Sequence, residues 1–320
     1  MIRARFIPAL AALVFAAAQL GCLSASPAPT EDQDAGGQAV DAGQADAGDF
    51  ERVRVATFNT HRFFDTVCQT GACGPDDYEA LPSQEAFDAQ ADQLAGALRT
   101  FDANVVMLQE VETQASLDAL TARVGDVLPN AVLGEIGTPG SVDVALMTSG
   151  EITQVIHHRD TLIRPDGSQT LFSRQLLEVH ITLGGKKVVA FAAHFRSKVS
   201  DDPGRRLAEA QKAHELVLAA AQAEPDALVV LGGDLNDVPG SPPLEALEGD
   251  GALLRVASDL PSAAQATYLF HGTGEAIDHI LVAVPGGGAY LPGTAHVLPG
   301  SPGYAGSDHD PLLADFALPR

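Results

Sequence analysis

The chain has 320 residues, a hydrophobic content of 46% and a formal net charge of −23. This length suffices for one large domain or two small ones, and the hydrophobic content suffices for a sizeable core. The acidic charge excludes the broad basic surface by which proteins usually hold many phosphates, so a polyanionic substrate would be bound locally, by a divalent cation and a few arginines.

Residues 1–22 predict an export signal. Two arginines precede an apolar run, residues 6–18, that is too short for a permanent membrane helix. The run leads into Ala18-Gln19-Leu20-Gly21-Cys22, which is similar to the lipobox of bacterial lipoproteins. We expect lipidation of Cys22, which would attach an exported bacterial protein to a membrane. Cleavage near Ser24, which would release the protein, is the alternative.

Residues 23–50 predict a flexible linker, because they are rich in Ala, Gly, Asp, Gln and Pro and contain scarcely any large apolar side chain. We therefore expect the folded catalytic domain to span residues 51–320. Near its start, Cys68 and Cys73 lie five positions apart, which predicts a disulfide in an oxidising compartment. A metal site is the alternative, but only two thiols and no nearby histidine argue against it.

From residue 51 onward, short apolar runs alternate with helical patterns, which is typical of an α/β domain. Apolar residues at helical spacing predict helices over 87–101 and 207–221. The predicted strands are 53–58, 104–109, 143–148, 175–183, 187–193, 227–232, 277–284 and 312–317.

Two of these strands are apolar without alternation, at 105–108 and 228–231, which fits strands covered on both faces. Others, such as 176–183, alternate more clearly between apolar and polar residues. We therefore expect a four-layer sandwich, in which two packed mixed β-sheets are flanked by helices, rather than one doubly wound parallel sheet.

Polar residues follow or interrupt the predicted strands. Each one alone is ordinarily a turn residue or a helix cap. Together, on successive strands, they would gather residues distant in sequence into one cleft. The residues are Asn59, Glu110, His194, Asp234, Asn236 and Asp278.

These residue types suit the hydrolysis of a phosphate ester by water. Glu110 and Asp308 offer hard oxygen ligands, which favour Mg²⁺ or Mn²⁺ over zinc, and the bound ion would neutralise charge on the phosphoryl oxygens. Asp234 could accept a proton from the attacking water. A carboxylate such as Asp278 would hold the ring of His309 and raise its pKa.

Six segments resemble, in order, the motifs of the endonuclease/exonuclease/phosphatase superfamily, which includes DNase I and bacterial sphingomyelinases. The resemblance covers about residues 53–317 and is closest to a branch of secreted bacterial nucleases. It implies a DNase I-like fold and a Mg²⁺ cofactor, with Mn²⁺ or Ca²⁺ as alternatives. The segments are 57–59 (Thr-Phe-Asn), 108–112 (Leu-Gln-Glu-Val-Glu), 193–195 (Ala-His-Phe), 233–237 (Gly-Asp-Leu-Asn-Asp), 277–280 (Ile-Asp-His-Ile) and 307–309 (Ser-Asp-His).

The resemblance also implies a role for each matching residue. Glu110 would ligate the metal, with Asn59 and Asp308 close to it. Asp234 and Asn236 would handle the nucleophile and the phosphate.

The remaining matches concern protonation and phosphate binding. His309 would pair with Asp278, and His194 matches the second catalytic histidine of the DNase-like and sphingomyelinase-like branches. Arg174 resembles a phosphate-contacting arginine. Independently of the resemblance, the residues that follow His194 predict a small basic rim, with a solvated helix start and loop as the alternative; they are Arg196, Lys198, Arg205 and Arg206.

The sequence therefore predicts an exported, metal-dependent phosphodiesterase that acts on DNA or RNA. A sphingomyelinase-like or small-molecule phosphodiester or phosphomonoester hydrolase is the alternative, because of the acidic charge. A non-catalytic, surface-binding lipoprotein is an alternative of another class. Two features depart from the superfamily pattern: His61-Arg62 replaces an Asn-containing continuation, and the Cys68–Cys73 loop is particular to this chain.

Overall fold

The computed structural model describes residues 50–300 and 303–319. The predicted export signal, Cys22 and nearly all of the predicted linker lie outside these residues. Within the described part, no helix is long and apolar enough to cross a membrane.

The larger of the two main sheets has seven strands and contains both ends of the described chain. β1 and β2 run parallel, and the remaining pairs in this sheet are antiparallel. The strand order is β15 (Ala289–Tyr290), β17 (Leu312–Pro319), β1 (Phe50–Phe63), β2 (Val105–Val111), β4 (Asp143–Thr148) and β3 (Asn130–Gly134), and β16 (His296–Val297) also pairs with β17.

The second main sheet has six strands, of which β9 and β10 run parallel to each other. Its other pairs are antiparallel. The strand order is β11 (Leu253–Arg255), β14 (Asp278–Ala283), β10 (Leu228–Asp234), β9 (Lys186–His194), β8 (Leu176–Leu183) and β5 (Glu151–His158).

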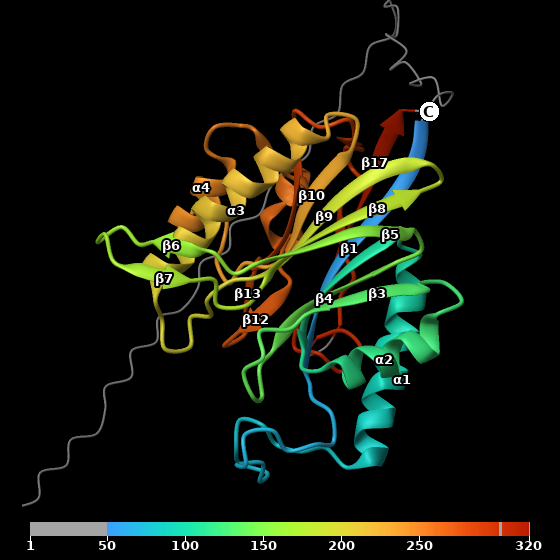
Figure 1. The fold of residues 1–320 in the computed structure, drawn as a ribbon, viewed down its shortest axis with the longest axis vertical. Coiled ribbons are helices and arrows are strands. Elements are labelled where there is room, and N and C mark those ends of the chain that lie inside the picture. The colour runs from blue at the N-terminus through green and yellow to red at the C-terminus, as the bar shows by residue number, and fades with distance from the viewer. Residues whose placement is uncertain (1–49, 301–302, 320) are drawn as a thin grey trace, which may run out of the picture. The chain divides into compact units, whose positions relative to one another are not determined.

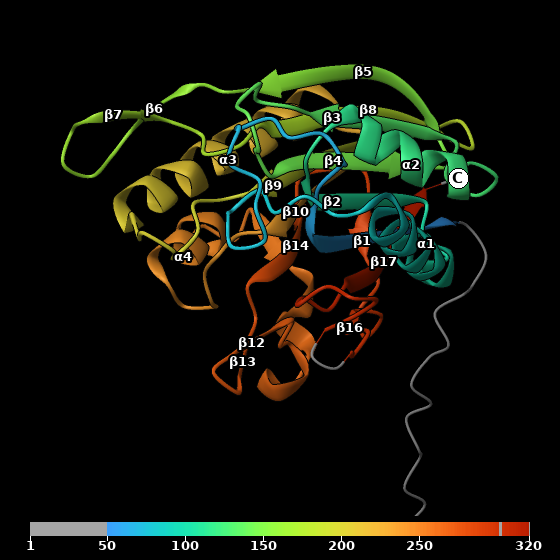
Figure 2. The ribbon, with the colours of Figure 1, turned by 90° about the horizontal axis from the view of Figure 1, so that it is seen from below.

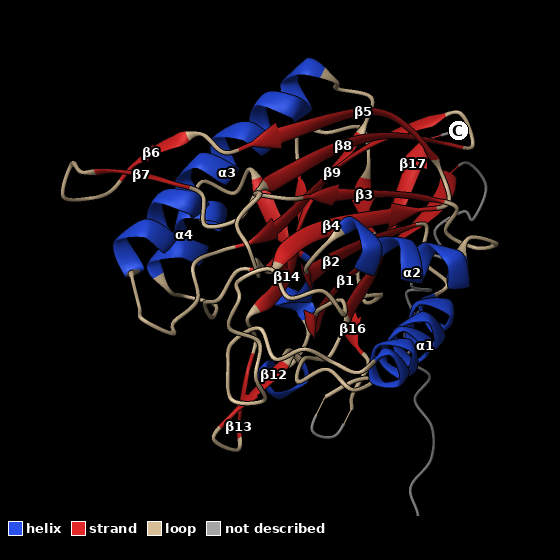
Figure 3. Cartoon of the chain, turned by 60° about the horizontal axis from the view of Figure 1, so that its bottom comes forward, coloured by secondary structure: helices blue, strands red, loops and turns tan. Residues whose placement is uncertain are grey.

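Helices cover the outer face of each main sheet, and Figures 2 and 3 show them on opposite sides of the strands. α1 (Gln84–Phe101) and α2 (Gln114–Val124) pack on the seven-stranded sheet, and α3 (Pro203–Ala223) and α4 (Pro242–Glu248) pack on the six-stranded sheet. The smaller elements are the hairpins β6 (Thr161–Ile163)–β7 (Gln169–Leu171) and β12 (Tyr268–Phe270)–β13 (Thr273–Glu275), and the 3₁₀ helices η1 (Val256–Asp259) and η2 (Ser262–Ala264).

The buried apolar residues form three clusters, one for each interface between layers. One joins α1 and α2 to their sheet around Phe58 and Leu94. A second lies between the two sheets and includes Met107 and Val230, and the third joins α3 and α4 to the six-stranded sheet around Val217. Four layers and three apolar interfaces confirm the predicted sandwich.

The predicted strands and both predicted helices overlap observed elements, while several short elements were not predicted. β2 and β10 are buried along nearly their whole length, as their unbroken apolar sequences predict. β5 was missed because it is an edge strand with no buried residue, so its sequence carries little apolar signal. The missed α4 begins after Ser241 with two prolines, which is an ordinary helix start.

Candidate active site

Strand register aligns polar side chains at one end of the sandwich. In the six-stranded sheet, Asp234 of β10 pairs with His194 of β9 on one side and with Asp278 of β14 on the other. In the seven-stranded sheet, Asn59 of β1 pairs with Gln109 of β2, immediately before Glu110. A hydrogen bond of 3.1 Å from Asn59 Nδ2 to Asp234 Oδ2 joins the two rows.

Asp234 lies at the centre of this group. Its Oδ2 is 3.6 Å from Nε2 of His194 and 4.0 Å from Nε2 of His309. Its Oδ1 accepts a hydrogen bond of 2.8 Å from the backbone N–H of Asn236. Burial, followed by the negative charge of Asp278, raises the pKa of Asp234 to about 7. Asp234 can therefore exchange a proton near neutral pH.

His309 carries a positive charge in this environment. Its burial opposes that charge, but Asp278 above all, together with Asp234 and Asp308, raises the pKa of His309 to about 10. Nδ1 of His309 lies 2.8 Å from Oδ2 of Asp278. The ring of Tyr268 covers the imidazole, with 4.9 Å between the ring centroids.

His194 is neutral, in contrast to His309. Burial lowers its pKa well below the ordinary value of 6.5, and the positive charges of Arg174 and His309 lower it further. The two histidines therefore approach the same carboxylate in opposite charge states. Titratable groups whose environments drive their pKa values apart are typical of acid–base sites.

The loop before β17 delivers Asp308 and His309 to this group. Ser307 Oγ donates a hydrogen bond of 2.7 Å to the backbone oxygen of Asn59 and accepts one of 2.9 Å from the backbone N–H of His309. The segment 307–309 is thereby fixed to β1, although about 250 positions separate it from Asn59 in the sequence.

Backbone geometry explains why two glycines precede Asp234. At Gly232, a Cβ atom would lie 2.2 Å from Cε of Met107 in the opposite sheet. At Gly233, where φ is +153°, a Cβ atom would lie 1.9 Å from the backbone oxygen of Ala193. The side chain of Met107 could shift to admit a larger residue at 232, but the backbone of Ala193 cannot, so glycine is required at 233.

Two of the polar residues adopt backbone conformations that are uncommon for non-glycine residues. Glu110 has φ of +65° and Asn236 has φ of +54°. The conformation of Asn236 is held by its N–H bond to Asp234 and by a hydrogen bond of 3.3 Å from its Nδ2 to the backbone oxygen of Phe195. Such strained conformations cluster at functional sites, where the surrounding structure enforces them.

Glu110 and Asp308 are partly exposed, whereas Asn59 belongs to the buried group. Oε2 of Glu110 accepts a hydrogen bond of 2.8 Å from the backbone N–H of Arg62. Oδ1 of Asp308 lies 2.8 Å from Nδ1 of His61 and 3.9 Å from Nε2 of His309.

The donor atoms of Glu110, Asn59 and Asp308 fit a hard divalent cation. The hydrogen bond to Asp308 and the negative charges of Asp308 and Glu110 raise the pKa of His61, so the space beside these carboxylates favours positive charge. Two carboxylates and one amide oxygen are the donors that Mg²⁺ prefers. Asp234, Asp278 and His309 also offer atoms within 4.8 Å of one another, but protonated His309 is a hydrogen-bond donor rather than a ligand.

The two predicted phosphate-binding arginines follow β7 and β9. Arg174 Nη1 donates a hydrogen bond of 3.3 Å to the backbone oxygen of Phe195, the residue after His194. Arg196 Nη2 donates to the backbone oxygen of Ser200, 2.9 Å away. Arg174 therefore lies beside the buried group, whereas the side chain of Arg196 is turned toward its own loop.

The prediction that Arg206 belongs to a basic rim is wrong. This side chain is buried, with 3% of its surface exposed, and its guanidinium pairs with Asp237 at 2.9 Å and with Asp201 at 2.8 Å. A cation that neutralises two carboxylates holds the loop in place and does not face a ligand.

The sequence did not reveal Glu209, which positions both arginine-bearing segments. Its carboxylate is fully buried and accepts a hydrogen bond from the backbone N–H of Ser173 and one from that of Arg196, each of 2.6 Å. Glu209 lies within α3, where helical periodicity does not distinguish a buried charge from an exposed one.

A family model described as Endonuclease/Exonuclease/phosphatase family matches residues 56–309. The chain belongs to this family. Its members are generally hydrolases of phosphoric esters and typically use divalent metals. No curated protein matches the chain significantly by sequence.

Solved structures from animals and bacteria share the fold. An endonuclease/exonuclease/phosphatase from Bacteroides vulgatus is 19% identical with a TM-score of 0.59, over 84% of this chain and 99% of the other. Truncated TDP2 from Caenorhabditis elegans is 17% identical with a TM-score of 0.58, over 83% and 97%. The beta toxin of Staphylococcus aureus is 18% identical with a TM-score of 0.55, over 82% and 99%.

Proposed function

We propose that this chain is an exported, Mg²⁺-dependent phosphodiesterase that cleaves DNA or RNA by attack of a water molecule. The observation that carries the proposal is the placement of Asp234, a carboxylate with a pKa of about 7, between a neutral His194 and a cationic His309. This group can take a proton from water and give one to a leaving group at the same pH.

Asp234 acts as the base in this proposal. Asn59 Nδ2 and the N–H of Asn236 hold its two oxygens and so fix the direction in which the carboxylate accepts a proton from the attacking water. Neutral His194 can donate or accept a hydrogen bond beside Oδ2 without adding charge.

His309 supports the phosphate and the leaving group. Asp278 fixes the imidazole through Nδ1, so Nε2 is directed toward the centre of the group, where it can donate to a phosphoryl oxygen or protonate the leaving oxygen. Arg174 adds positive charge on the side of His194.

Glu110, Asn59 and Asp308 would hold the divalent ion. When bound, the ion neutralises negative charge on the phosphoryl oxygens and orients the phosphate. The carboxylates of Glu110 and Asp308 are partly exposed, so both would be accessible to an ion from solvent.

Nucleic acid is the preferred substrate class. TDP2 of Danio rerio, 16% identical with a TM-score of 0.56 over 83% of this chain and 98% of the other, was solved in a complex with a single-strand DNA product. Binding by a few local cations also suits a chain whose net charge is −23, because no wide basic surface is required.

One panel of assays tests the proposal. Purified protein is incubated with DNA, RNA, sphingomyelin vesicles and bis(p-nitrophenyl) phosphate, each with Mg²⁺, Mn²⁺, Ca²⁺ or EDTA. We expect metal-dependent cleavage of nucleic acid and of the chromogenic diester, and loss of both in Asp234→Asn. Identical background rates for wild type and variant would instead favour a non-catalytic binding protein.

Phospholipid hydrolysis is a second candidate, supported by the β12–β13 hairpin. Leu269 and Phe270 are 52% and 50% exposed at its tip, directly after Tyr268, whose ring covers His309. Exposed apolar side chains beside a catalytic group suit an interface with lipid. Turnover of sphingomyelin without cleavage of nucleic acid would replace the nuclease proposal with this one.

Export and lipidation of Cys22 are part of the proposal and rest on the N-terminal sequence. Expression of the full chain in a bacterium, with metabolic labelling by a fatty acid, tests them. We expect label in the wild-type membrane fraction and none in Cys22→Ser. Unlabelled protein in the medium would favour cleavage near Ser24.

A further inference from the structure

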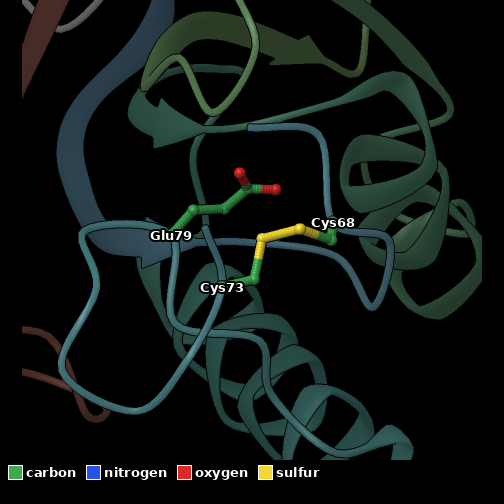
Figure 4. A group of neighbouring side chains, drawn as sticks. All are labelled: Cys68, Cys73 and Glu79. Carbon is green, nitrogen blue, oxygen red and sulfur yellow. A yellow bond between two sulfur atoms is a disulfide. The ribbon is translucent and has the colours of Figure 1, made fainter. Parts of the chain in front are cut away.

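The loop between β1 and α1, residues 64–82, is held by a disulfide and by hydrogen bonds to a buried carboxylate. Cys68 and Cys73 form a disulfide, and the fully buried carboxylate of Glu79 accepts hydrogen bonds from the backbone N–H groups of Gln69 and Thr70, at 2.5 and 2.7 Å (Figure 4). Gln69 in turn accepts a bond of 3.2 Å from the N–H of Gly140. These bonds cross-link the loop and join it to the connection between β3 and β4.

This cluster is a structural cross-link rather than a metal site. Sγ of Cys68, Sγ of Cys73 and a carboxylate oxygen of Glu79 lie within 4.8 Å of one another, which is close enough for ligation. However, a cysteine ligand must be a thiolate, and both sulfurs are bonded to each other. The disulfide and the hydrogen bonds to Glu79 fix the position of the preceding residue.

That residue is Tyr78, whose side chain remains 51% exposed. The guanidinium carbon of Arg62 lies 4.6 Å from the centre of its ring, and the buried Phe64 packs against the ring edge-on at 5.9 Å. The ring is thus fixed by a cation and an aromatic neighbour while about half of its surface stays open to solvent.

Arg62 connects this ring to the candidate metal site. Its backbone N–H donates to Oε2 of Glu110 at 2.8 Å, while its side chain lies over Tyr78. Figures 1 and 2 show the loop (light blue) at the end of the sheets that carries the β12–β13 hairpin. Arg62 therefore contacts both the aromatic ring of Tyr78 and the candidate metal ligand Glu110.

The charges of the site act on Tyr78. Burial is the largest cause that raises the pKa of its hydroxyl, and the charge of Glu110 raises it further, while Arg174 and Arg62 oppose the shift. Two arginines and a metal-ligating carboxylate thus lie within electrostatic range of the ring. This surface offers a half-exposed aromatic ring beside positive charge.

The backbone that presents Arg62 is strained. His61 and Arg62 have φ of +53° and +49°, and neither is glycine. Two hydrogen bonds enforce this turn, one from the N–H of His61 to Oδ1 of Asn59 and one from the N–H of Arg62 to Glu110. Strain of this kind persists only where the surrounding structure enforces it, so Arg62 is preset over Tyr78.

We propose that Tyr78 and Arg62 form a nucleotide subsite beside the scissile phosphate, in which Tyr78 stacks on an unpaired base and Arg62, with Arg174, contacts flanking phosphates. The subsite rests on the proposed nuclease function and narrows its substrate to single-stranded or locally unpaired nucleic acid. Only an unstacked base can lay its face on an exposed ring, and every base has such a face, so sequence preference is weak.

Tyr78→Ala tests the subsite, with Tyr78→Phe as the variant that keeps the ring. Steady-state constants are measured with a fluorescent single-stranded oligonucleotide and with bis(p-nitrophenyl) phosphate. Because stacking on an aromatic side chain is lost, KM for the oligonucleotide should rise about tenfold in Tyr78→Ala, while kcat stays within about twofold. Tyr78→Phe should match wild type on both substrates, and the small diester should not distinguish any of the three proteins.

Val284→Ala is the control, since Val284 is 59% exposed and directly follows β14 at the end opposite Asp278. It should leave the oligonucleotide KM unchanged. Thermal unfolding of each variant checks that the fold is retained.

The outcomes separate the two proposals. An unchanged oligonucleotide KM in Tyr78→Ala, or an equal loss on the small diester, would overturn the subsite while the nuclease function stands. Hydrolysis of the diester by wild type with no cleavage of any nucleic acid would overturn the nuclease proposal, and the subsite with it.

Discussion

Nδ1 of His309 lies 2.8 Å from Oδ2 of Asp278, and both side chains are buried. Asp278 begins β14, whereas His309 lies in the loop before β17, so the contact joins the six-stranded sheet to a loop attached to the other sheet. Since the carboxylate both orients the ring and stabilises its charge, the two residues should act as one unit.

Asp278→Asn should therefore lower kcat for the chromogenic diester by about 10²- to 10⁴-fold, the usual contribution of a positioned acid or base. His309→Ala should have a similar effect. The double variant should be scarcely worse than either single variant, because a residue that acts through its partner contributes nothing once the partner is gone. Multiplicative losses in the double variant would contradict this coupling.

Glu110→Gln should weaken Mg²⁺ binding by about tenfold or more, since one charged oxygen ligand becomes neutral. Isothermal titration with Mg²⁺ measures this directly and does not depend on turnover. Glu151→Gln, which neutralises an exposed acid at the start of β5, is the matched control and should bind Mg²⁺ as wild type does. Equal affinities in all three proteins would remove Glu110 from the metal site.

The two glycines 233 and 96 should respond in opposite ways to alanine. Gly233→Ala places a methyl group 1.9 Å from the backbone oxygen of Ala193, and backbone cannot yield as a flexible side chain does. We expect a loss of about 4 kcal/mol or more in the free energy of unfolding. Gly96 is exposed within α1 and its added Cβ would meet nothing within 4 Å, so Gly96→Ala should stabilise by about 0.5–1 kcal/mol.

Urea unfolding of the purified variants measures both changes. A near-neutral Gly233→Ala would show that β9 and β10 can separate at this point. It would also show that a residue with a Cβ atom can directly precede Asp234 in β10.

The sequence predicted the strands that carry the site because those strands are buried on both faces. An unbroken apolar run such as 228–231 can be recognised in the sequence alone. The polar residues that follow it must lie near the end of that strand. Strand register then brings Asp234 between His194 and Asp278, which the sequence alone could suggest only through the family motifs.

Other features depend on tertiary contacts that leave no local pattern. Arg206 looks like part of a basic run with Arg205, and only its buried pairing with Asp237 shows that it is structural. Glu209 and Tyr78 gain their roles from segments far away in the chain. α2 is different, because Leu117, Leu120 and Val124 have helical spacing after the capping residue Thr113, so a local sequence pattern does indicate this helix.

A charged network on the outer face of the six-stranded sheet should make stability depend on pH. Glu178 of β8 lies 2.6 Å from Nε2 of His158 and 2.7 Å from Nε2 of His180, and it is 6% exposed. Burial opposes the charge of Glu178, but the hydrogen bonds from both histidines lower its pKa from 4.5 to about 2. The hydrogen bond to Glu178 is the main cause that raises the pKa of His180 above 6.5.

The two shifts have opposite consequences for stability. The folded pKa of Glu178 is depressed, so its contribution is complete above pH 4.5 and is lost as the pH falls toward about 2. The folded pKa of His180 is raised, so its contribution is complete below pH 6.5 and is lost as the pH rises through the raised value. The network should therefore stabilise the fold most between pH 4.5 and 6.5.

Glu178→Gln should lower the free energy of unfolding by on the order of 2 kcal/mol at pH 5.5, the usual contribution of hydrogen bonds to a charged group. The loss should shrink toward pH 2 and again at alkaline pH, where wild type has already lost one charge of the network. Denaturant unfolding across this range, with the exposed Glu245→Gln as control, measures the dependence. A loss of equal size at every pH would mean that Glu178 stabilises the sheet by packing and not by its charge.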